Sequence, residues 1–149
     1  MNSLFNTRDT TGILQRINEI KPETQGKWGR MDAAQMLAHC AIYMEAATGK
    51  SITHRMLIGR LLGRILRPKF SSDKPFRHGS PTANDFKVTG QRDFNSEKEK
   101  LTRLIVEFAE KGPAGVTTRP HPFFGRLKAD EWGEGSYKHI DHHLKQFGI

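Results

Sequence analysis

Apolar residues in this sequence recur with the spacing of a helix in several separate stretches, and almost none alternate as they would in a strand. This pattern predicts an all-α fold. A first helix is expected over about residues 8–20, ending before Pro22 because proline disfavours helical geometry in the residue that precedes it. A second, alanine-rich helix is expected from Asp32, a favourable N-cap, to Gly49.

Two further long helices are predicted in the second half of the chain. Ser96 and Glu99 have the spacing of a capping box, which indicates the start of a helix that Gly112 ends. The last helix is expected over about residues 129–147, with acidic residues in its first turns, where the helix dipole favours them.

A shorter helix over about residues 53–66, closed by Pro68, is predicted between the second and third long helices. The long connection that follows carries three phenylalanines, which indicate packing against the body of the protein: Phe70, Phe76 and Phe86. These lengths predict an antiparallel four-helix bundle with a long crossover and this short extra helix, in one domain over residues 1–149.

The positive charge of the chain is concentrated in one segment. The formal net charge is +8, and residues 50–79 hold eight Lys or Arg and one acid, a net of +7. The helix predicted there is basic and amphipathic, which is typical of helices that lie on anionic membranes or contact phosphates. Packing against the bundle explains its apolar residues equally well, and the arginines would then form a solvated face or a rim that attracts an acidic substrate. The apolar residues concerned are Leu57, Leu61, Leu62 and Ile65.

Several classes of protein are disfavoured by simple features of the sequence. Cys40 is the only cysteine, so no internal disulfide can form, and the N-terminus lacks the features of a signal peptide. No apolar run approaches the roughly 20 residues that span a bilayer. We therefore expect a cytoplasmic protein. Aromatic and basic residues do not interleave, so nucleic acid is not an expected partner. A membrane is not expected either, although the basic segment leaves both open.

Three histidines carry the sharpest chemical signal. His139 and His143 are four residues apart on the last predicted helix, and they share a face with Trp132 and Ile140, so they should point inward. Burying an unpaired imidazole costs on the order of 1–3 kcal/mol, and a metal ion would bind a nitrogen from each ring. His39 lies on a second inward-facing helix and is a candidate third ligand. A metal-free bundle with hydrogen-bonded core histidines is the alternative.

Four segments together resemble the DinB/YfiT-like superfamily, and within it a small branch known mainly as a domain of unknown function. They are QMLAHC (35–40), HPFFG (121–125), HIDHHLKQFG (139–148) and the W-G-x-M stretch from Trp28 to Met31. The resemblance implies a four-helix bundle with a three-ligand divalent metal site, one ligand from the second helix and two from the last. By position these are His39, His139 and His143. It also implies a homodimer.

The same resemblance implies a reaction class. The superfamily includes metal-dependent thiol transferases and a mycothiol-dependent isomerase, so attack by a low-molecular-weight thiol is the expected chemistry. Three protein ligands leave coordination positions free for water or substrate. The metal would be zinc, nickel or iron, since three imidazoles suit each of them. We therefore predict a metal-dependent S-transferase or hydrolase with an unidentified small-molecule substrate. The alternative is a non-catalytic module that binds phosphate, nucleic acid or a membrane through residues 50–79.

Four further residues are candidates for roles beside the metal. Gln35 and Tyr43 lie four residues before and after His39 and share its helix face, where they could orient water or substrate or simply satisfy polar groups at the edge of the core. His121 could line the mouth of a pocket or cap its own loop. Ser136 is a candidate partner for an imidazole N–H.

Overall fold

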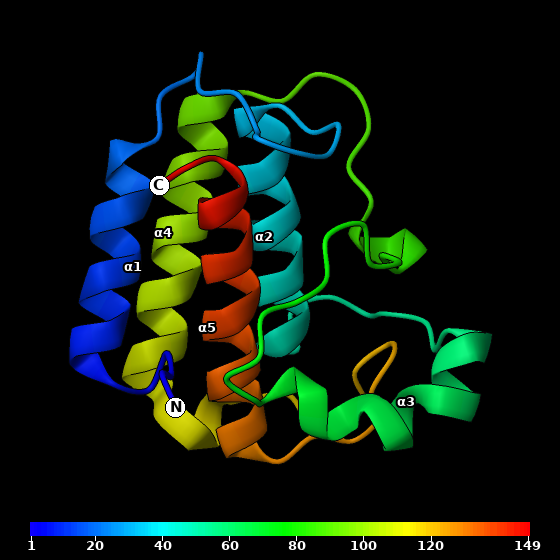
Figure 1. Cartoon of the computed structure of the whole chain (residues 1–149). Helices are drawn as coiled ribbons and strands as arrows, with labels where there is room; N and C mark the ends of the chain where they lie inside the picture. Colours follow the sequence, from blue (N-terminus) through cyan, green and yellow to red (C-terminus); the bar gives the residue numbers. More distant parts are fainter.

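The computed structural model describes residues 1–149 and contains five α-helices and no strand, so the all-α prediction is confirmed. Four long helices lie side by side as a helical bundle, and α3 is set apart from them at one end (Figure 1). The helices are α1 (Thr7–Glu19), α2 (Ala33–Ala47), α3 (Leu57–Phe70), α4 (Phe94–Lys111) and α5 (Ala129–Gln146). Two short 3-10 turns, Asn84–Phe86 and Gly112–Gly115, lie between them. None of the helices is long and apolar enough to cross a membrane.

The starts of the helices follow their capping side chains. The Asp32 side chain accepts a hydrogen bond from the backbone N–H of Gln35, which confirms Asp32 as the N-cap of α2. The prediction that a capping box at Ser96 starts this helix is wrong. Asp93 caps α4, because its carboxylate accepts the backbone N–H of Ser96 at 2.8 Å, and the helix therefore begins at Phe94.

Helix α3 also differs from the prediction, since it begins four residues later and continues through Pro68 to Phe70. A proline in the last turn of a helix removes one backbone hydrogen bond, and here the packing of Phe70 holds that turn in place. The Phe70 side chain is only 2% exposed and belongs to the core, as does Phe86, and Phe76 packs against that core. The expectation that the long connection is attached to the body of the protein is confirmed.

The core consists of 24 buried hydrophobic residues drawn mainly from the four long helices. Helix α2 is the most deeply placed, since 11 of its 15 residues are buried. Its alanines present little side-chain volume, so neighbouring helices can approach its backbone closely. This position buries His39, near the middle of α2, so that its side chain is only 4% exposed.

Helix α3 does not bury its aliphatic stripe, so the reading in which this stripe packs against the bundle is wrong. Leu57, Leu61 and Ile65 are 72–78% exposed, and Leu62 is 43% exposed. The face that α3 turns inward is instead its glycine face. A Cβ atom at Gly59 would lie 2.6 Å from the carbonyl oxygen of Phe123, so only a residue without a side chain permits this approach.

Candidate metal centre

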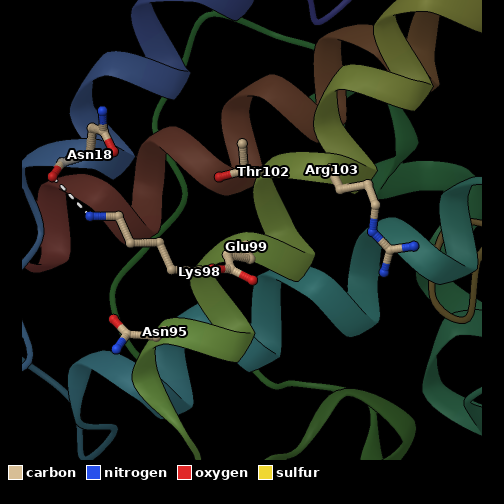
Figure 2. A pocket seen from close by; sticks show the side chains of 6 residues that line it. All are labelled: Asn18, Asn95, Lys98, Glu99, Thr102 and Arg103. Atoms are coloured by element: carbon tan, nitrogen blue, oxygen red, sulfur yellow. Dashed lines mark hydrogen bonds between the residues drawn. The ribbon is translucent and has the colours of Figure 1, made fainter.

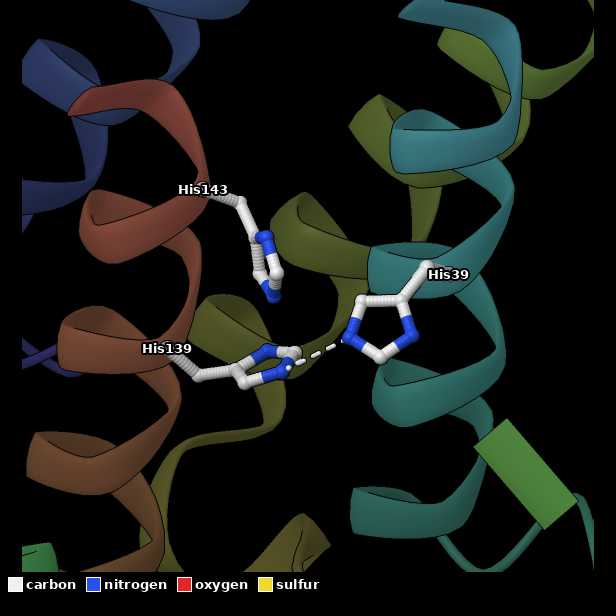
Figure 3. A group of neighbouring side chains, drawn as sticks. All are labelled: His39, His139 and His143. Atoms are coloured by element: carbon white, nitrogen blue, oxygen red, sulfur yellow. Dashed lines mark hydrogen bonds between the residues drawn. The ribbon is translucent and has the colours of Figure 1, made fainter. Parts of the chain in front are cut away.

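The three predicted histidines converge between α2 and α5. His39 projects from α2 and meets His139 and His143, which project from α5 (Figure 3). One nitrogen from each ring lies within 4.8 Å of the other two, and the Nε2 atoms of His39 and His139 are 3.1 Å apart. Ligand nitrogens held about 2.0–2.1 Å from one tetrahedral metal lie roughly 3.3 Å apart. The His39 and His139 nitrogens already have this spacing, and the His143 nitrogen lies near enough for the three residues to hold one metal ion.

Hydrogen bonds orient two of the rings with Nε2 toward the centre. His39 donates its Nδ1–H to the backbone carbonyl of Phe86 at 2.7 Å, which leaves its Nε2 lone pair free. His143 donates its Nδ1–H to Oε1 of Gln146 at 2.8 Å, while Nε2 of Gln146 donates to the carbonyl of Trp28 at 2.6 Å. The second bond fixes the amide so that its oxygen faces the imidazole. These outer contacts present two basic nitrogens to one point.

The hydrogen bonds within the protein do not satisfy both ring nitrogens of His139. Its ring stacks on Tyr43, with centroids 4.1 Å apart, and its Nδ1 atom is buried without a hydrogen-bond partner. Because the Nε2 of His39 is already an acceptor, the tautomers of His139 leave either two lone pairs facing each other or a buried nitrogen without a donor. A cation bound by both Nε2 atoms would remove the repulsion of the first arrangement.

Burial keeps the three imidazoles neutral, which is the form that binds metals. Desolvation lowers the pKa of His39, and it lowers that of His139 well below its usual value. The pKa of His143 falls to about 3 for the same reason, with a smaller contribution from His39. At neutral pH all three rings therefore offer nitrogen lone pairs without first losing a proton.

The three histidines line a cavity of about 730 Å³, a volume typical of small-molecule sites. Much of its wall is aromatic, including Phe70, Phe86 and Phe124. The 27 lining residues include no aspartate and no glutamate. Three cations also line it, and none of them forms an ion pair: Lys69, Lys74 and Arg77.

Two of the candidate neighbours also line this cavity. Tyr43 is fully buried, and burial raises the pKa of its phenol, so it remains a hydrogen-bond donor. His121 accepts the backbone N–H groups of Phe123 and Phe124 at Nδ1, so it caps its loop and carries its proton on Nε2. Burial, with help from the charge of Arg55, lowers the pKa of His121 to about 3, so the ring is neutral.

The other two candidates lie elsewhere. Gln35 does not line the cavity, because its side chain accepts the backbone N–H of Asp32 and donates to the carbonyl of Gly90. Ser136 does not contact an imidazole nitrogen; its Oγ is 3.4 Å from the hydroxyl of Tyr43. Helical phase placed both residues on suitable faces, but their nearest hydrogen-bond partners determine where the polar atoms point.

Sequence reasoning missed the outer contacts of the site. Gln146 lies three residues after His143 on one helix, so the i, i+3 rule could have identified it. The carbonyl of Phe86 carries no side-chain signal, and nothing in the sequence indicates it. His142 and Trp28 also line the cavity and form an aromatic cluster with His78, in which the Trp28 and His78 rings stack with centroids 3.8 Å apart.

A second hollow of about 390 Å³ lies on the surface of α4 (Figure 2). Its six lining residues include no hydrophobic side chain and no histidine, and Lys98 crosses it to the backbone carbonyl of Asn18 at 2.8 Å. A hollow without apolar walls buries little of a ligand's surface. The cavity at the three histidines is the better candidate.

Comparison with known proteins gives one match. A family model described as "Protein of unknown function (DUF1569)" matches residues 5–148, which include all three histidines and the loop that carries His121. No curated protein matches the chain, and no solved structure does. Because the match covers almost the whole chain, this protein belongs to the DUF1569 family.

Proposed function

We propose that this chain is a DinB-like metalloenzyme whose four long helices form an antiparallel bundle around a site for one divalent transition metal. The observation that carries the proposal is the convergence of three neutral imidazoles at the wall of a cavity large enough for a small molecule. The proposed ligands of the metal are His39, His139 and His143. Zinc, nickel and iron all suit three imidazoles, and a three-ligand site keeps coordination positions for substrate.

The chemistry follows from an open site of this kind. A divalent metal supplies Lewis acidity when bound, which lowers the pKa of a coordinated water or thiol. Around it, Tyr43 and His121 are neutral groups that would orient a substrate by hydrogen bonding, and the aromatic wall would contact its apolar part. We infer transfer of a low-molecular-weight thiol, or hydrolysis, as the reaction class.

The lining of the cavity also defines the substrate class. Aromatic side chains favour an apolar body, while Lys69, Lys74 and Arg77 favour an anionic group. With no carboxylate on the wall, a carboxylate or phosphate of the substrate has no acidic competitor for these cations. A small organic anion with an apolar part therefore fits the cavity best.

Elemental analysis tests the metal site directly. Untagged protein, purified without metal-affinity resin, should carry close to one metal per chain, and His143→Ala should lose it while staying helical by circular dichroism. The matched control is His54→Ala, because the His54 side chain is 85% exposed, pairs with Asp85, and does not line the cavity. This control should keep its metal. Protein that stays metal-free after reconstitution with zinc, nickel and iron would favour the metal-free bundle instead.

A further inference from the structure

Helix α3 presents a ridge of aliphatic side chains to solvent. Leu57, Leu61 and Ile65 recur every four residues, so they form one line along the helix, and they are 77%, 78% and 72% exposed. Ile58 and Leu62 flank this line at 47% and 43% exposure. Folded proteins seldom leave so many large aliphatic residues together on one short helix unless the surface contacts something else.

The opposite face of α3 is held by the body of the protein, so the ridge cannot turn inward. Gly59 and Gly63 lie against the backbone of Phe123, and neither position has room for a side chain. At the end of the helix, the Phe70 ring packs against Gly135 of α5. Figure 1 shows α3 apart from the four long helices, and the only helix it contacts is α5.

The charge around the ridge indicates what covers it. Arg60 and Arg64 lie beside the ridge on the exposed surface of α3, and neither forms an ion pair. Of the eight basic residues in segment 50–79, Lys50 and Arg67 pair with glutamates and three others line the cavity, so Arg60 and Arg64 supply the charge beside the ridge. A surface that is both aliphatic and positively charged is complementary to a surface with a negatively charged outer layer and an apolar interior.

Other occupants fit these observations less well. A second copy of the chain would bring its own arginines against those of the first, and like charges would oppose the contact. Single-stranded nucleic acid binds by stacking its bases on aromatic side chains, and this ridge has none. An aliphatic face flanked by Arg is instead the pattern of helices that lie in the interface of a bilayer.

We propose that α3 docks this protein on an anionic phospholipid surface. Leu57, Leu61 and Ile65 enter the boundary between headgroups and acyl chains, while Arg60 and Arg64 contact the lipid phosphates. The helix lies in the membrane plane and does not cross it. The docking surface is separate from the three histidines, so it operates whether or not the cavity holds a metal.

Co-sedimentation of the full chain with vesicles tests the proposal. Vesicles of phosphatidylcholine with phosphatidylserine should carry the protein down, and vesicles of phosphatidylcholine alone should not. Leu61→Glu should weaken binding at least tenfold, and so should Arg60→Gln combined with Arg64→Gln, because each cation near such a surface contributes about fivefold. Thr11→Glu, on the exposed surface of α1, makes the same change in charge as Leu61→Glu and should bind as the parent does.

Three results would overturn the proposal. The first is absence of binding to anionic vesicles at low salt. The second is binding that Leu61→Glu and Thr11→Glu weaken equally, since the ridge would then contribute only through net charge. The third is concentration-dependent self-association without lipid that Leu61→Glu abolishes, which would identify a second copy as the occupant. Because the ridge is exposed, the variants should fold, and circular dichroism with metal content checks this independently.

Discussion

The contact between Phe70 and Gly135 gives the sharpest test of how α3 is held to the bundle. A Cβ atom at Gly135 would lie within 2.6 Å of three atoms of the Phe70 ring, closer than any real contact. The ring is 2% exposed and cannot move aside easily, because Phe76, Phe124 and His121 surround it at centroid distances of 6.2, 4.7 and 5.2 Å. We therefore expect Gly135→Ala to destabilise the protein.

The magnitude follows from two opposing effects. Alanine is a better helix former than glycine by about 0.8–1 kcal/mol, whereas overpacking a tight core costs about 1–3 kcal/mol. Gly12→Ala, in the middle of α1, is the matched control, because a Cβ atom there has no neighbour within 4 Å. It should gain the helix-forming contribution alone. The difference in unfolding free energy between the two alanine variants should therefore be about 1–3 kcal/mol.

Urea denaturation followed by circular dichroism measures this difference. At this chain length, 1 kcal/mol corresponds to a shift in Tm of about 2–4 °C, so thermal unfolding offers a second readout. Gly135→Ala should unfold at lower urea and Gly12→Ala at higher urea than the parent. If both substitutions stabilise the protein equally, the Phe70 ring does not occupy the space beside Gly135 and the described placement of α3 is incorrect.

Three other predictions concern the cavity and its histidines. Metal-free protein should lose stability as the pH falls below about 6.5, because histidines of the unfolded chain bind protons there and the buried imidazoles do not. For His121 and His143, whose pKa values are about 3, the loss approaches about 1.4 kcal/mol per pH unit for each residue between pH 6.5 and pH 3. Urea denaturation at several pH values measures this loss. Gln146→Ala should weaken metal binding about 10- to 100-fold, because His143 loses the acceptor of its Nδ1–H. Competition with a chelator measures the affinity, and an unchanged value would contradict this role of Gln146. Arg77→Gln should weaken the binding of an aryl carboxylate by up to about fivefold and leave the binding of the matching neutral amide unchanged. Calorimetry measures both affinities, and an equal loss for the two ligands would contradict a charge contact.

Much of the candidate site was predictable, because the spacing of residues along a helix indicates which way the three histidines face. His139 and His143 are four residues apart, and their apolar neighbours on α5 indicate which side faces the core. His39 lies in a helix with apolar residues on nearly every face, which is typical of a buried helix. The hydrogen bonds that orient these rings were not predictable in the same way. The His39 bond spans 47 residues and the Gln146 bond to Trp28 spans 118, and no local pattern marks such contacts.

By itself, the sequence determined that the chain is helical, where the four long helices lie, and that His39, His139 and His143 face inward, because each of these properties depends on side chains within a few turns of one another. Only the tertiary structure decided that Asp93 rather than Ser96 begins α4, that Gln35 points away from the cavity, and that α3 turns its glycine face inward. The aliphatic stripe of α3 fits a buried and an exposed helix equally well. The deciding contact is the fit of Gly59 and Gly63 against a loop some 60 residues away, and such a fit exists only once the chain has folded.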